Sequence, residues 1–117
     1  MEKEKNIPLG NFLIAPGVFD SIVALATEEV EGIAIYTGGV VVKITERIGR
    51  KSFLKGIRTK IEDRKISAEL SIVVEYGYNI KEKALETQRN IYQALQSMVG
   101  LDVDRITITG AAPGQFL

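Results

Sequence analysis

The sequence predicts an α+β fold: a two-layer sandwich in which a mostly antiparallel sheet carries two long helices on one face. Three observations predict it: apolar and polar residues alternate over residues 57–76, and apolar stripes of helical period run through residues 16–31 and 79–99. Each strand and helix has only one apolar side, so the two layers must bury those sides against each other. The expected order is β-α-β-(α)-β-β-α-β, in a single domain over residues 1–117 with a core of about 9–110 and short flexible ends.

The first elements are a short strand at Gly10–Ile14 and a helix over Pro16–Glu31. Gly32 is suited to the left-handed conformation that closes a helix, and a brief strand at Ile33–Thr37 follows. The apolar side chains of the helix recur about one turn apart and form one predicted stripe: Val18, Ile22, Leu25, Ala26 and Val30.

The next stretch, Val40–Gly49, fits two structures. Its three consecutive valines favour a strand, because β-branched side chains pack well on a pleated surface. However, Val40, Ile44 and Ile48 are spaced by four, which favours a short helix. A helix is the expectation, followed by a basic loop at Arg50–Lys55.

A long hairpin is predicted next, with a strand at 57–62, a tight turn at Asp63-Arg64 and a second strand from Lys65. Its core-facing side is expected to continue as far as Tyr76. That side consists of alternate residues: Ile66, Ala68, Leu70, Ile72, Val74 and Tyr76.

A helix from Asn79 to about Val99 is expected to cover this hairpin, with Asn79 as its N-cap and Glu82 in the capping-box position. A final strand at Val103–Gly110 should contain a bulge near Asp104, where the alternation changes phase. The helix's predicted core stripe is Ala84, Gln88, Ile91, Leu95 and Met98, widened by Leu85, Tyr92 and Val99.

The chain contains neither histidine nor cysteine, which excludes thiol catalysis, zinc-thiolate sites and Ser-His-Asp triads. We therefore expect no enzyme activity, no catalytic residues, no cofactor and no metal. Gln88 interrupts an otherwise apolar stripe, and we expect it to bond a neighbouring backbone group or to lie at the boundary of the stripe. The charged start MEKEKNIPLG is not expected to act as a signal peptide, and no apolar run is long enough to span a membrane, so direct membrane insertion is not expected.

Positive charge is concentrated in residues 43–65, which contain nine basic and three acidic side chains, although the whole chain has a formal net charge of zero. This excess favours contact with nucleic acid, an anionic lipid surface or an acidic partner, and it also fits a solvated hairpin that pairs with acidic parts of the fold. The candidate residues for binding an anion or a partner are Lys43, Arg47, Arg50, Lys51, Lys55 and Arg58.

Several segments occur in a characteristic order: Ile14-Ala15-Pro16, Gly38-Gly39, Gly49-Arg50-Lys51, Lys55-Gly56-Ile57, Val74-Glu75-Tyr76-Gly77-Tyr78-Asn79-Ile80 and Met98-Val99-Gly100-Leu101. In this order they resemble the alkaline shock protein family, the envelope stress response proteins of Gram-positive bacteria. The resemblance covers about residues 9–110 and also favours a helix at Val40–Gly49.

The resemblance implies a non-enzymatic cytoplasmic interaction or scaffold protein that acts in envelope stress and homeostasis. It further implies self-association and recruitment to the inner face of the cell membrane by a membrane-anchored partner protein. The alternative is a nucleic-acid-binding module that uses residues 43–65.

Overall fold

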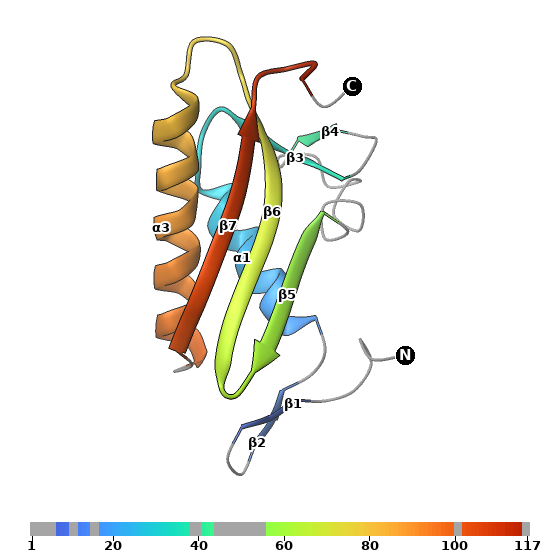
Figure 1. Ribbon diagram of the computed structural model, residues 1–117, viewed down its shortest axis with the longest axis vertical. Helices are drawn as coiled ribbons and strands as arrows, with labels where there is room; N and C mark the ends of the chain where they lie inside the picture. Colours follow the sequence, from blue (N-terminus) through green and yellow to red (C-terminus); the bar gives the residue numbers. More distant parts are fainter. Residues whose placement is uncertain are drawn as a thin grey trace.

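The computed structural model describes residues 7–9, 12–14, 17–37, 41–43, 56–99 and 102–115, and it confirms a two-layer α+β fold (Figure 1). Helix α1 lies behind the larger sheet in Figure 1, and α3 runs alongside β7. The elements are β1 (Ile7–Leu9), β2 (Phe12–Ile14), α1 (Val18–Glu28), β3 (Ile33–Tyr36), β4 (Val41–Lys43), β5 (Ile57–Glu62), β6 (Lys65–Val74), α3 (Ile80–Val99) and β7 (Asp102–Ala111).

Strand β6 is the centre of the larger sheet. Along one side it pairs in parallel with β7, from Lys65↔Asp102 to Val73↔Ala111. Along the other side it pairs antiparallel first with β5 and then with β3, so these two strands lie end to end. The sheet is therefore mostly antiparallel, as predicted, and β7 is parallel because α3 carries the chain back to the starting end of β6.

The β5–β6 hairpin closes at the predicted turn. Asp63 and Arg64 have φ angles of 51° and 63°, and Glu62 pairs with Lys65 directly across them. Positive φ at both central residues is the backbone of a type I′ turn, whose twist matches that of the flanking strands. The turn thus fixes the register of the hairpin.

Two further local predictions are confirmed. The Asn79 side chain caps α3, because its Oδ1 accepts a hydrogen bond of 3.0 Å from the backbone N–H of Glu82. The bulge near Asp104 is also present, since Ile66 pairs with Val103 while the next residue, Ser67, pairs with Arg105.

The core lies between the sheet and the two helices, and the alternate residues Ile66 to Val74 of β6 are almost completely buried in it. Tyr76 was predicted to share this side, but it is 81% exposed, because β6 ends at Val74 and Tyr76 lies in the turn before α3. The helices contribute Phe19, Ile22, Val23, Ala26, Ile91 and Leu95.

Both predicted helical stripes were partly wrong. Val18 and Leu25 of α1 are exposed, and Phe19 and Val23 are buried in their place, because α1 packs between β5 and α3. On α3, Leu85 and Tyr92 do not widen the buried stripe and remain 40% and 43% exposed. The width of each stripe is set by which neighbours cover the helix, and helical spacing alone does not specify that.

The helix predicted at Val40–Gly49 is wrong over Val41–Lys43, which forms β4. Val42 pairs antiparallel with Ile35, so the backbone gains sheet hydrogen bonds that suit its run of valines. Val40 and residues 44–49 lie outside the described residues. The predicted strand at Gly10–Ile14 appears as Phe12–Ile14, paired with a strand at Ile7–Leu9 that the sequence did not predict.

Substitutions at Gly32 and Gly17 provide a matched test of how the chain packs against Tyr78, just before the start of α3. Both have a positive φ, 80° and 86°, so alanine at either position should cost about 1–2 kcal/mol of backbone strain. A Cβ on Gly32 would lie 2.5 Å from the Tyr78 ring, whereas one on Gly17 meets nothing within 4 Å. Urea unfolding should therefore show a larger stability loss for Gly32→Ala than for Gly17→Ala, and equal losses would contradict this packing.

Candidate interaction surface on the open sheet face

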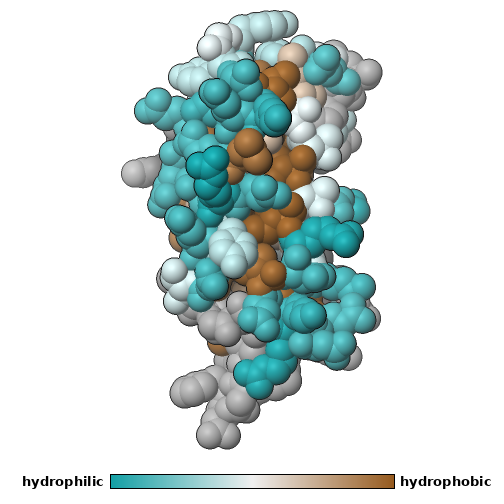
Figure 2. Space-filling model, turned by 60° about the vertical axis from the view of Figure 1, so that its left-hand side comes forward, coloured by the Kyte–Doolittle hydropathy of each residue, from teal (hydrophilic) through white to brown (hydrophobic). Residues whose placement is uncertain are grey.

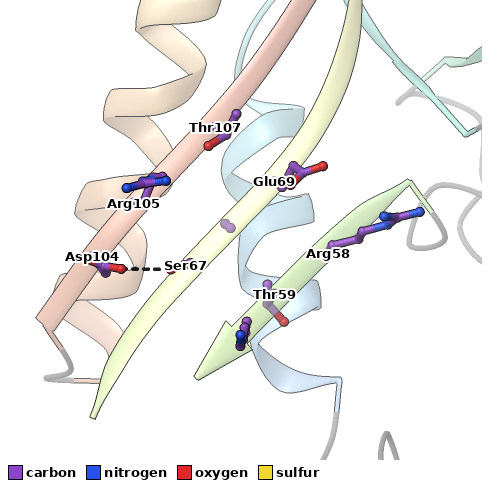
Figure 3. Close-up of a pocket in the computed structure, with 9 residues that line it drawn as sticks. Arg58, Thr59, Ser67, Glu69, Asp104, Arg105 and Thr107 are labelled. Atoms are coloured by element: carbon purple, nitrogen blue, oxygen red, sulfur yellow. Dashed lines mark hydrogen bonds between the residues drawn. The ribbon is translucent and has the colours of Figure 1, made fainter. Parts of the chain in front are cut away.

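The side of the sheet opposite the helices carries two rows of polar residues across β5, β6 and β7 (Figure 3). Lys60, Ser67 and Arg105 form one row, and Arg58, Glu69 and Thr107 form the next. These six residues, which we call the open sheet face, line a shallow cavity of about 430 Å³ together with Asp104. Side chains alternate along each strand, so this face is the outward counterpart of the buried core.

Charges of both signs are interleaved on the open sheet face. Three cationic side chains, Arg58, Lys60 and Arg105, lie among two carboxylates, Glu69 and Asp104. Lys60 pairs with Glu62 at 3.4 Å on the exposed surface, and Asp104 accepts a hydrogen bond of 3.4 Å from the Ser67 hydroxyl.

Arg58 and Arg105 have no hydrogen bond or ion pair to any other described residue. As far as the described residues show, their guanidinium groups are therefore available to an external acceptor. Guanidinium groups bind carboxylates and phosphates through paired hydrogen bonds, which makes them effective contacts for either kind of partner.

Of the six candidate residues predicted from the sequence, Arg58 is the one whose side chain the structure describes, and it is exposed on the open sheet face. Lys43 ends β4, on the far side of β3 from β6, and its side chain is not described. The other four candidates lie outside the described residues: Arg47, Arg50, Lys51 and Lys55.

Lys60 and Arg105 lie with Arg58 on this face, although neither was among the six candidate residues predicted from the sequence. The position of Lys60 follows from the alternation of β5, which places it on the same side as Arg58. The position of Arg105 depends on the parallel pairing of β7 with β6, which no local pattern reveals.

Gln88 has the role expected for a polar residue in an apolar stripe. Its Nε2 donates a hydrogen bond of 2.8 Å to the backbone oxygen of Ile106 on β7. The side chain thus links α3 to the outer strand of the sheet.

The described part of the chain contains no cluster of three or more acidic side chains arranged to hold a metal ion. Within the same residues, neither helix is both long and apolar enough to cross a membrane.

A family model of the alkaline shock proteins, described as having a cell envelope-related function, matches residues 4–110. The chain belongs to the alkaline shock protein family. The resemblance seen in the sequence is thereby confirmed, and the family description assigns the chain a cell envelope-related function.

Curated relatives agree with this assignment. The uncharacterized protein YqhY of Bacillus subtilis (strain 168) is 34% identical to this chain over 100 residues. The aligned region covers 86% of this chain and 74% of YqhY. A stress response regulator gls24 homolog of Streptococcus pyogenes serotype M3 is 29% identical over 91 residues, covering 77% of the chain and 46% of the homolog. No solved structure gives a significant match.

Neighbouring residues on β5 should respond differently to substitution, because they lie on opposite sides of the sheet. Thr59 faces α1, where its hydroxyl donates to a carboxylate oxygen of Asp20, so Thr59→Val should lower the free energy of unfolding by about 1–2 kcal/mol. Arg58 is exposed, so Arg58→Ala should change it by less than about 1 kcal/mol. Denaturant unfolding measures both, and a comparable loss at Arg58 would show that it has a structural partner.

Proposed function

We propose that this alkaline shock family protein is a non-enzymatic scaffold of the cell-envelope stress response. It acts in the cytoplasm by associating with itself and with a membrane-anchored partner protein, which recruits it to the inner face of the cell membrane. The observation that carries this proposal is the open sheet face, where charged side chains from three strands lie exposed on a shallow surface.

The shape of this surface favours contact with a macromolecule. Small-molecule sites are usually concave and mostly apolar, so that they bury most of their ligand. The open sheet face is shallow instead, and it is lined by charged and hydroxyl side chains. A polar partner surface with complementary charges can cover it without either protein changing its fold.

The pattern of charge supports a selective partner. Arg58 lies directly opposite Glu69 across the strands, while Lys60 and Arg105 flank Ser67 in the neighbouring row. Interleaved charges disfavour binding to a partner whose charges do not complement them, because like charges would then be brought together. Similarity to a relative named as a stress response regulator supports a role in stress regulation for this chain as well.

Charge reversal at Arg58 tests the proposal. We expect Arg58→Glu to reduce, several-fold, the crosslinking of the protein in its native cells to a membrane-anchored partner, because it replaces an exposed cation with an anion. Arg64→Glu is the matched control: it makes the same charge change on the same hairpin, at an exposed position in the turn. Equal crosslinking by both variants, or no crosslinked protein partner for the wild type, would overturn the proposal.

A second candidate function, binding of nucleic acid through residues 43–65, is favoured by the position of Arg58 and Lys60 on one face, to which Arg105 of β7 adds a third cation. Fluorescence anisotropy with a single-stranded oligonucleotide should then show affinity that falls as salt rises. Arg58→Ala should reduce the logarithmic salt slope by about 0.7, the value for one lost phosphate contact. Absence of binding at low salt would eliminate this candidate, and Glu69 at the centre of the face weighs against it.

A further inference from the structure

Strand β7 has one free edge within the described part of the chain, because its described pairing is with β6 alone. The Ile106 carbonyl accepts its hydrogen bond from Gln88 of α3, so it points away from β6. The N–H and C=O of one residue in a strand point to the same side, and this side alternates along the strand. The backbone groups of Ile106, Ile108 and Gly110 therefore face outward.

Helix α3 overhangs this edge with apolar side chains. Leu85 and Tyr92 lie three residues before and four after Gln88, so the three side chains share one stripe of the helix. Leu85 and Tyr92 are 40% and 43% exposed, and a groove of about 240 Å³ separates Tyr92 from Val103 and Ile106. Figure 2 shows this junction of α3 and β7 as a hydrophobic column with hydrophilic surface on both sides.

The edge is protected at one end only. Its first part contains the bulge and three charged residues, Asp102, Asp104 and Arg105, which are features that discourage pairing with another strand. The second part, Ile106–Ala111, contains no charge, proline or bulge. This uncharged part lies beneath the first half of α3, since a Cβ on Gly110 would be 3.1 Å from the Ile80 side chain.

We propose that the β7 edge and its α3 overhang bind an extended segment of a partner protein, which adds to the sheet as a further strand. Its backbone would pair with Ile108, Gly110 and the N–H of Ile106, whose carbonyl already accepts from Gln88, and its alternate apolar side chains would pack against Leu85 and Tyr92. Arg89 and Arg105 also line the groove beside a single carboxylate, Asp104, and neither arginine has an ion pair within the described residues. The segment therefore carries acidic residues at the end that meets these arginines.

Charge selects such a segment over a second copy of this chain. A twofold axis that placed Leu85 of one copy against Tyr92 of the other would pass near the middle of the stripe, at Gln88 and Arg89. The two copies of Arg89 would then face each other in a newly buried interface, which is unfavourable. Carboxylates on an extended partner segment satisfy the same arginines.

The inference can be tested with an acetylated peptide in which valine and threonine alternate and which ends in two glutamates. At millimolar concentration this peptide should slow hydrogen exchange of the outward amides of Ile106, Ile108 and Gly110 by about tenfold. The inward amides of Thr107 and Thr109, which already face β6, serve as an internal reference.

Substitutions on α3 and α1 locate the peptide. Leu85→Glu should weaken binding about tenfold, because it removes an apolar contact and adds a repelling carboxylate. Leu25→Glu is the matched control, since Leu25 is 49% exposed on α1 and lines the separate groove between α1 and α3. Arg58→Glu should leave binding unchanged, because Arg58 lines the open sheet face and not this groove, so this variant distinguishes the two sites although Arg105 lines both.

Four outcomes would overturn the inference. Equal binding of a peptide that ends in two lysines would refute the acidic partner. Protection of the outward amides that rises with protein concentration without peptide would assign the edge to a second copy. Lack of protection, or equal weakening by Leu25→Glu and Leu85→Glu, would show that the edge is not the docking site.

Discussion

The fold depends on the pairing of β6, which carries a hydrogen-bonded strand along each side and the centre of the core on one face. Its core-facing residues, Ile66 to Val74, are at most 2% exposed. A slip of one residue would exchange them for Ser67 and Glu69, which would bury a hydroxyl and a charge without partners. The same constraint that fills the core therefore holds the open sheet face in register, so the two faces are specified together.

The crossover through α3 determines what lies at the edge of the sheet. Because α3 returns the chain to the start of β6, β7 pairs in parallel and brings Arg105 beside Ser67 and Lys60. The same crossover leaves the outer side of β7 next to α3, where Gln88 reaches the Ile106 carbonyl. One connection thus completes the polar face and also creates the apolar groove at the strand edge.

The sequence predicts local features of this fold well because they have local causes. The hairpin alternation, the turn at Asp63-Arg64, the Asn79 cap and the bulge at Asp104 each depend on a few adjacent residues. The features that failed depend on contacts between distant elements. β4 forms because β3 offers it a partner, and the position of Arg105 depends on a parallel register set across the whole α3 crossover.

Two of the wrongly predicted core residues mark an apolar surface beside the edge of the sheet. Leu85 and Tyr92 have the spacing of core residues, yet no described element covers them, and both overhang a strand edge that has no described partner. Exposed leucine and tyrosine beside free backbone groups can bury apolar area and form sheet hydrogen bonds in one step. The open sheet face has the opposite chemistry, since it offers charges and hydroxyls whose own backbone groups are already paired. The two surfaces therefore suit different partners, and they meet at Asp104 and Arg105, which line both.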